Sequence, residues 1–118
     1  MSIRVLAVVP DLFFATKIEA VARAAGATLA TVPAPQAFER CAAEPPDRVL
    51  VDLHAPGAIA LVAALKADER TRGIPVTGFY SHVETALRAE ALAAGTDDVL
   101  PRSAFVTRLP ALLGGAPH

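Results

Sequence analysis

The sequence predicts an α/β domain in which a parallel five-stranded sheet carries helices on both faces. Short runs rich in Val, Leu and Ile alternate five times with segments in which apolar residues recur at helical spacing. The first and third runs are apolar almost throughout, which is typical of strands that are buried on both faces. Such strict alternation predicts parallel strands joined by right-handed helical crossovers.

Each predicted strand is a short apolar run that ends at a turn-forming residue. Pro10 and Asp11 end the first run, and Pro56 with Gly57 closes the third, which carries Asp52. The predicted strands cover residues 3–9, 28–32, 48–52, 74–80 and 98–100.

Each predicted helix rests on apolar spacing and on residues typical of helix ends. Gly26 supplies a C-terminal cap, Ser81 and Glu84 match the capping box of the fourth helix, and Ser103 is the predicted N-cap of the fifth. Pro110, Gly114 and Gly115 are expected to keep that last helix short. The first four predicted helices cover residues 14–25, 35–43, 58–67 and 83–94.

With five strands, the expected architecture is a flavodoxin-like three-layer sandwich with strand order 2-1-3-4-5. Its switch point lies between the first and third strands, where open α/β sheets bind their ligands. Asp11 follows the first strand and Asp52 ends the third, so we expect both carboxylates in one crevice. For Asp52, the alternative role is a helix cap or a turn.

Length and composition restrict the class of protein. The 118 residues are expected to form one domain, residues 1–118, and 53% of them are hydrophobic. A net charge of −1 without a basic patch argues against a nucleic-acid partner. Cys41 is the single cysteine, which excludes an internal disulfide, and we expect it in the core. Neither a signal peptide nor a membrane-length apolar run is visible, so we expect a cytoplasmic protein.

Three segments are similar to those of response-regulator receiver domains, in the same order and at the same spacing. They are VDLHAPG at 51–57, ADERTRGIPV at 67–76 and ALAAGTDDVL at 91–100, and the resemblance covers nearly the whole chain. Receivers take a phosphoryl group from a kinase histidine onto an aspartate. The resemblance therefore implies a two-component signalling protein and a Mg²⁺ ion that neutralises the repelling charges.

The resemblance implies roles for particular residues. Asp52 matches the phosphoacceptor, Asp11 the acidic residue that contacts the metal, and His54 the residue whose backbone carbonyl would be a further ligand. Tyr80 stands at the position of the phosphate-binding hydroxyl, and Arg102 at that of the phosphate-binding lysine.

Several positions depart from the family pattern. Pro10 replaces the first acidic residue, and Val99 replaces the aromatic switch residue of the fifth strand. Tyr80 is bulkier than a threonine, and Ser81 is the alternative hydroxyl. Arg102 presents a planar fork in place of a compact ammonium. These changes favour a degenerate receiver with poor or absent phosphorylation, in which Asp11 and Asp52 could still hold a weakly bound Mg²⁺.

Leu12 and Phe13 add apolar bulk at the mouth of the expected site. The alternative is that they start a helix and pack on their own neighbours.

Two functions are therefore open. The first is a stand-alone pseudo-receiver, not an enzyme, that binds a histidine kinase or a downstream signalling protein, with homodimerisation through the fourth helix, fifth strand and fifth helix. The second is a working phosphoacceptor that is phosphorylated on Asp52 with Mg²⁺.

A remote third alternative is a cobalamin-binding domain, because Asp52, His54 and Gly57 match an Asp-x-His-x-x-Gly pattern. In that family the pattern follows the first strand, whereas here it follows the third.

Overall fold

The computed structural model describes residues 3–81 and 84–114, in which five strands and five helices alternate. The strands are β1 (Arg4–Val8), β2 (Thr28–Thr31), β3 (Arg48–Asp52), β4 (Val76–Tyr80) and β5 (Asp98–Pro101). The helices are α1 (Leu12–Ala25), α2 (Ala34–Ala43), α3 (Ala58–Ala67), α4 (Thr85–Ala94) and α5 (Arg102–Leu112).

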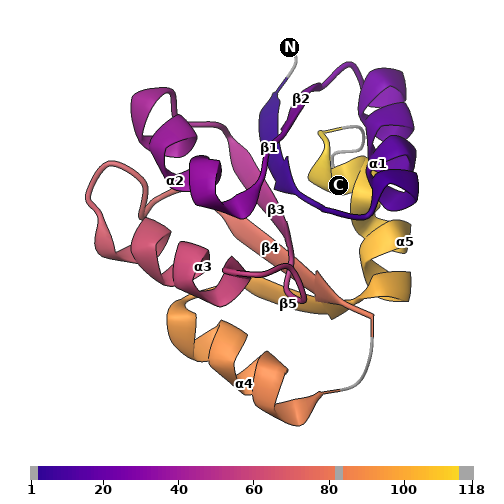
Figure 1. The fold of residues 1–118 in the computed structure, drawn as a ribbon. Helices are drawn as coiled ribbons and strands as arrows, with labels where there is room; N and C mark the ends of the chain where they lie inside the picture. Colours follow the sequence, from indigo (N-terminus) through magenta and orange to yellow (C-terminus); the bar gives the residue numbers. More distant parts are fainter. Residues whose placement is uncertain (1–2, 82–83, 115–118) are drawn as a thin grey trace.

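The strands form one parallel sheet in the order β2-β1-β3-β4-β5, which confirms the predicted topology. Helices α1 and α5 cover one face of this sheet, and α2, α3 and α4 cover the other (Figure 1). The result is the flavodoxin-like three-layer sandwich. Because the strands are parallel, all five end at the same edge, called here the carboxyl edge.

A separate apolar core lies on each face of the sheet. Successive residues of β3 point to opposite faces, so Val49 and Val51 pack toward α2 and α3 while Leu50 packs toward α1 and α5. All three are fully buried, which explains why this strand is apolar without alternation. On the α1 and α5 face, Phe79 stacks on Phe105 with ring centroids 4.5 Å apart.

Cys41 is buried in the core on the α2 face, which confirms its predicted place. Burial raises the pKa of its thiol to about 11. A thiol with so high a pKa stays protonated and unreactive near neutral pH.

The strand bounds agree with the predicted ones to within two residues, but two helix starts were predicted wrongly. Helix α4 begins at Thr85 with Glu84 as its N-cap, so Ser81 does not cap it. β4 runs to Tyr80, and Ser81 lies in the exposed bend that leaves this strand. Residues 82, 83 and 115, which entered the helix-end predictions, lie outside the described residues.

Helix α5 also begins earlier than predicted, because Pro101 is its N-cap and Ser103 already lies in its first turn. Proline has the extended backbone that an N-cap requires, and here its φ is −65° and its ψ 152°. Pro110 lies inside the last turn and does not end the helix, which continues to Leu112. None of the helices within residues 3–81 and 84–114 is long and apolar enough to cross a membrane.

The amino edge of the sheet, where the strands begin, is held by Lys66 near the end of α3. Its Nζ donates hydrogen bonds to the carbonyl of Ile74 at 2.8 Å and to Asp97 Oδ2 at 2.9 Å. Asp97 Oδ2 also accepts from the backbone N–H of Val76 at 2.7 Å. Burial acts to raise the pKa of Asp97, but these hydrogen bonds and the lysine charge outweigh it, so the pKa is lowered. The network ties α3 to the starts of β4 and β5.

Candidate functional site

Asp52 lies at the centre of the carboxyl edge. It is the last residue of β3, between β1 and β4, and it is half-buried. Its Oδ1 accepts a hydrogen bond from the backbone N–H of His54 at 2.9 Å, which starts the loop from β3 to α3. Among the residues that the structure describes, none donates a hydrogen bond to Oδ2. One oxygen of this carboxylate therefore remains available to a ligand.

Asp11 lies at the same edge and acts as a helix cap. β1 pairs with β3 with Val8 opposite Val51, so the residues after both strands emerge together. Asp11 is the N-cap of α1, and its Oδ1 accepts from the backbone N–H groups of Phe13 at 3.0 Å and Phe14 at 3.2 Å. Asp11 is thus a helix cap at the switch point, a role that was not predicted for it from the sequence.

The second oxygen of Asp11 faces Arg102, the first residue of α5. The Nη2 of Arg102 lies 3.5 Å from Asp11 Oδ2, and the guanidinium carbon lies 3.8 Å from the centroid of the Phe14 ring. A guanidinium over an aromatic face is attracted by the ring's negative face. Arg102 can reach Asp11 because α1 and α5 lie side by side on one face of the sheet (Figure 1).

These contacts keep Asp11 ionised. The hydrogen bond from the Phe14 N–H lowers the pKa of Asp11, and burial opposes it. The N–H of Phe13 and the hydrogen bond and charge of Arg102 lower this pKa further. Both oxygens of Asp11 are therefore engaged by donors from the chain itself.

The other predicted site residues lie at the end of β4 and on the loops after β3 and β4. Tyr80 is the last residue of β4 and lines a hollow of about 360 Å³ together with Thr85 and Arg88 of α4. Ser81 is exposed. His54 lies two residues beyond Asp52, and its Nδ1 lies 3.6 Å from Glu84 Oε2, so the two loops are in contact.

The oxygen donors at this edge are a poor match to a magnesium ion. Mg²⁺ requires octahedral geometry and is usually held by one or two carboxylates with several waters. Asp52 offers Oδ2, whereas Oδ2 of Asp11 faces the Arg102 guanidinium, whose positive charge repels a cation at this place. In residues 3–81 and 84–114, no group of three or more His, Cys, Asp or Glu side chains could hold a metal.

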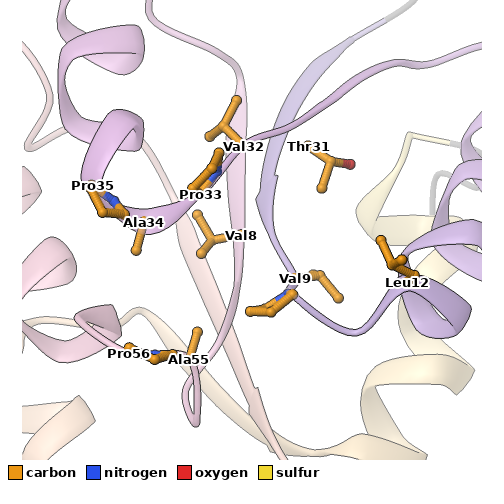
Figure 2. A pocket seen from close by; sticks show the side chains of 11 residues that line it. Val8, Val9, Leu12, Thr31, Val32, Pro33, Ala34, Pro35, Ala55 and Pro56 are labelled. Carbon is orange, nitrogen blue, oxygen red and sulfur yellow. The ribbon is translucent and has the colours of Figure 1, made fainter.

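The sequence predictions missed an apolar groove next to these carboxylates. It has a volume of about 410 Å³ and lies between the ends of β1, β2 and β3 (Figure 2). The sequence does contain a signal for this groove. Pro10, Pro33, Pro35 and Pro56 follow the three strands, and the parallel topology brings the ends of these strands to one edge.

Leu12 and Phe13, beside this groove, are 80% and 92% exposed. They begin α1, as the alternative predicted, but these exposed fractions show that neither side chain packs closely on its neighbours.

Comparison with known proteins gives matches among solved structures. No protein-family profile and no curated sequence matches the chain. A response-regulator candidate from Chloroflexus aurantiacus is similar with a TM-score of 0.83 and 21% identity, over 97% of this chain and 99% of that one. The receiver domain of the sensor histidine kinase PA1611 from Pseudomonas aeruginosa gives 0.80 and 24%, over 97% and 99%. The phosphorylated cyanobacterial phytochrome response regulator RcpA gives 0.79 and 17%, over 98% and 91%.

The chain has the receiver-domain fold. The match extends over almost the entire length of each chain, so every element of the receiver fold is present here. The PA1611 receiver holds a magnesium ion in its active-site cleft. In the present chain, the carboxyl edge carries Pro10, Asp11 as the N-cap of α1, and the Arg102 guanidinium.

Proposed function

We propose that this chain is a degenerate receiver, a signalling module that binds a protein partner and is not switched by phosphorylation. In this proposal the chain is not an enzyme, and it acts in the cytoplasm. Its partner is a histidine kinase or a downstream signalling protein, as the receiver resemblance implies.

The observation that carries the proposal is the engagement of Asp11. Transfer of a phosphoryl group to a carboxylate needs a cation that neutralises both charges and aligns the reacting atoms. Asp11 would have to hold that cation, but it already binds two backbone N–H groups and faces Arg102 at 3.5 Å. Arg102 is held against Phe14, so it supplies a fixed positive charge in place of an exchangeable ion.

The groups around Asp52 support the same proposal. Pro10 brings no carboxylate to the edge. Tyr80 brings a ring where the resemblance implies a small hydroxyl, and its ring lines a hollow against α4.

A working phosphoacceptor is the second candidate, and one observation favours it. Asp52 is half-buried at the carboxyl edge, and no described residue donates to its Oδ2. An oxygen of this kind could attack a phosphorus atom if the charge on the donor were neutralised.

A small phosphodonor separates the two candidates. We expect no phosphoryl adduct on Asp52 after incubation with acetyl phosphate and millimolar Mg²⁺, measured by intact-mass spectrometry. A Mg²⁺-dependent adduct that is absent from Asp52→Asn would favour the phosphoacceptor instead.

A variant that restores the family pattern provides the positive control. Pro10→Asp, Tyr80→Thr and Arg102→Lys, combined in one chain, return the first acidic residue, the small hydroxyl and the lysine. We expect this variant to gain both the adduct and a Mg²⁺-dependent rise in melting temperature, because an ion that binds only the folded state stabilises it. Unmodified protein with the same rise in melting temperature would contradict the proposed role of Arg102.

A further inference from the structure

The apolar groove beside the candidate site has the size of a small-molecule pocket. Its volume of about 410 Å³ falls within the range of roughly 300–1,000 Å³ that is typical of ligand pockets. Val8 and Val32 form part of its wall and are almost fully buried, so the groove reaches down to the core. Leu12 and Pro35 stand on opposite sides of it (Figure 2).

The chemistry of the lining defines the class of ligand. None of the residues that line the groove is charged, and Thr31 brings the only polar side chain among them. A charged ligand would lose its hydration here without gaining a partner, which is costly. Complementarity therefore favours an uncharged, apolar molecule with at most one hydrogen-bonding group.

The walls of the groove are rigid. Pro10, Pro33, Pro35 and Pro56 all line it. Proline fixes its own φ and carries no N–H, so these walls are stiff and offer few hydrogen-bond donors. A preformed site loses little conformational entropy when a ligand binds, which raises affinity.

We propose that this groove binds a small uncharged apolar or aromatic molecule. The site is separate from the phosphoryl chemistry of Asp52 and does not depend on the function proposed above. It lies at the switch point between β1 and β3, where open α/β sheets place their ligands.

The test uses the fluorescent probe N-phenyl-1-naphthylamine, which is uncharged, apolar and carries one N–H. We expect saturable one-to-one binding to the full chain. Ala34→Leu fills the groove and should weaken binding by about tenfold or more. Ala24→Leu adds the same bulk at an exposed position on α1 outside the groove and should leave the affinity unchanged.

Two further variants keep the test decisive. Thr31→Lys places a charge at the rim on an exposed residue, so it should weaken binding without unfolding the protein. Phe13→Ser removes the most exposed ring, which does not line the groove, and should leave binding intact.

Three outcomes would overturn the proposal. Probe binding that survives Ala34→Leu and Thr31→Lys would show that the groove is not the site. Loss of binding in Phe13→Ser would assign the probe to an exposed protein-docking surface. An affinity that falls as protein concentration rises would show that a second copy of the chain fills the groove.

Discussion

The Asp11 carboxylate makes two kinds of contact at the carboxyl edge. It caps the start of α1, and it faces Arg102, which lies 91 positions further along the chain. The sequence predicts that Asp11 lies at the carboxyl edge, because the residue follows an apolar strand. It does not predict the pairing with Arg102, which depends on α5 packing beside α1 and on the conformation of a long side chain. The contact between the Arg102 guanidinium and the Phe14 ring was missed for the same reason.

The charge of Asp11 should make the stability of the protein depend on pH. The pKa of Asp11 is lowered in the folded state from its ordinary value of 3.8, so the folded state holds this proton less tightly than the unfolded state. The contribution of the ionised Asp11 to folding stability is therefore fully present above pH 3.8 and is lost as the pH falls through the lower folded-state pKa.

Asp11→Asn keeps an oxygen that can cap α1 but removes the charge. We expect the variant to lose less stability than the unmodified protein on acidification below pH 3.8, measured by urea denaturation at a series of pH values. If the stabilities of the two proteins fell equally as the pH was lowered, the lowered pKa of Asp11 in the folded state would be contradicted. Asp11→Ala serves for comparison, because it removes the cap as well and should also lower stability at neutral pH.

At the scale of an element, the packing at the centre of β4 requires a glycine, Gly78. Gly78 pairs with Val51, and a Cβ at this position would lie 2.8 Å from Cδ2 and 2.9 Å from Cγ of Leu53. Leu53 is 2% exposed and follows Asp52 directly, so its packing fixes the start of the loop from β3 to α3. A glycine in a strand interior is thus explained by the close approach of this leucine.

Gly78→Ala should destabilise the protein by about 1–3 kcal/mol, because the added methyl overpacks a closed core. Gly73→Ala is the matched control, since a Cβ there meets no atom within 4 Å, and we expect a change of about 0.5 kcal/mol or less. Urea denaturation of both variants gives the comparison. Equal stability of Gly78→Ala and the unmodified protein would show that Leu53 moves aside freely.

Elements that rest on apolar periodicity were predicted well, and helix starts that rest on single polar residues were not. Helix α3 has the predicted bounds, Ala58–Ala67, because its apolar residues have one packing solution against the sheet. Ser81 was predicted as a cap from its capping-box spacing to Glu84, and Ser103 from its residue type. The N-caps are Glu84 and Pro101 instead, and neither makes a side-chain cap hydrogen bond that a sequence pattern could reveal.

At the scale of the whole molecule, we propose that the face made by α4, β5 and α5 binds the protein partner. Val99 on β5 packs against the core beneath α2, α3 and α4, and Tyr80 lines a hollow with α4. A ligand shifts a conformational equilibrium only if it binds the two states differently. Val99 is stiff at its first torsion, so this face offers a phosphoryl group little to move.

We expect this face to keep one conformation. Amide NMR shifts of residues 84–109 should stay unchanged when beryllofluoride and Mg²⁺ are added, apart from residues next to Asp52. Asp52→Asn, treated in the same way, provides the baseline for non-specific effects. Large saturable shifts across α4, β5 and α5 in the unmodified protein alone would reveal a working switch.

The hydrogen bonds of Lys66 lie at the amino edge of the sheet, opposite to Asp52, the groove and Arg102. This hydrogen-bond network is thus spatially separate from the residues at the carboxyl edge. Exchanging exposed carboxyl-edge residues for those of another protein should leave this network intact, because within residues 3–81 and 84–114 no carboxyl-edge loop supplies a hydrogen-bond partner to Lys66 or Asp97. Substitutions of exposed carboxyl-edge residues can therefore change the chemistry of the candidate site without breaking the hydrogen bonds of Lys66 and Asp97.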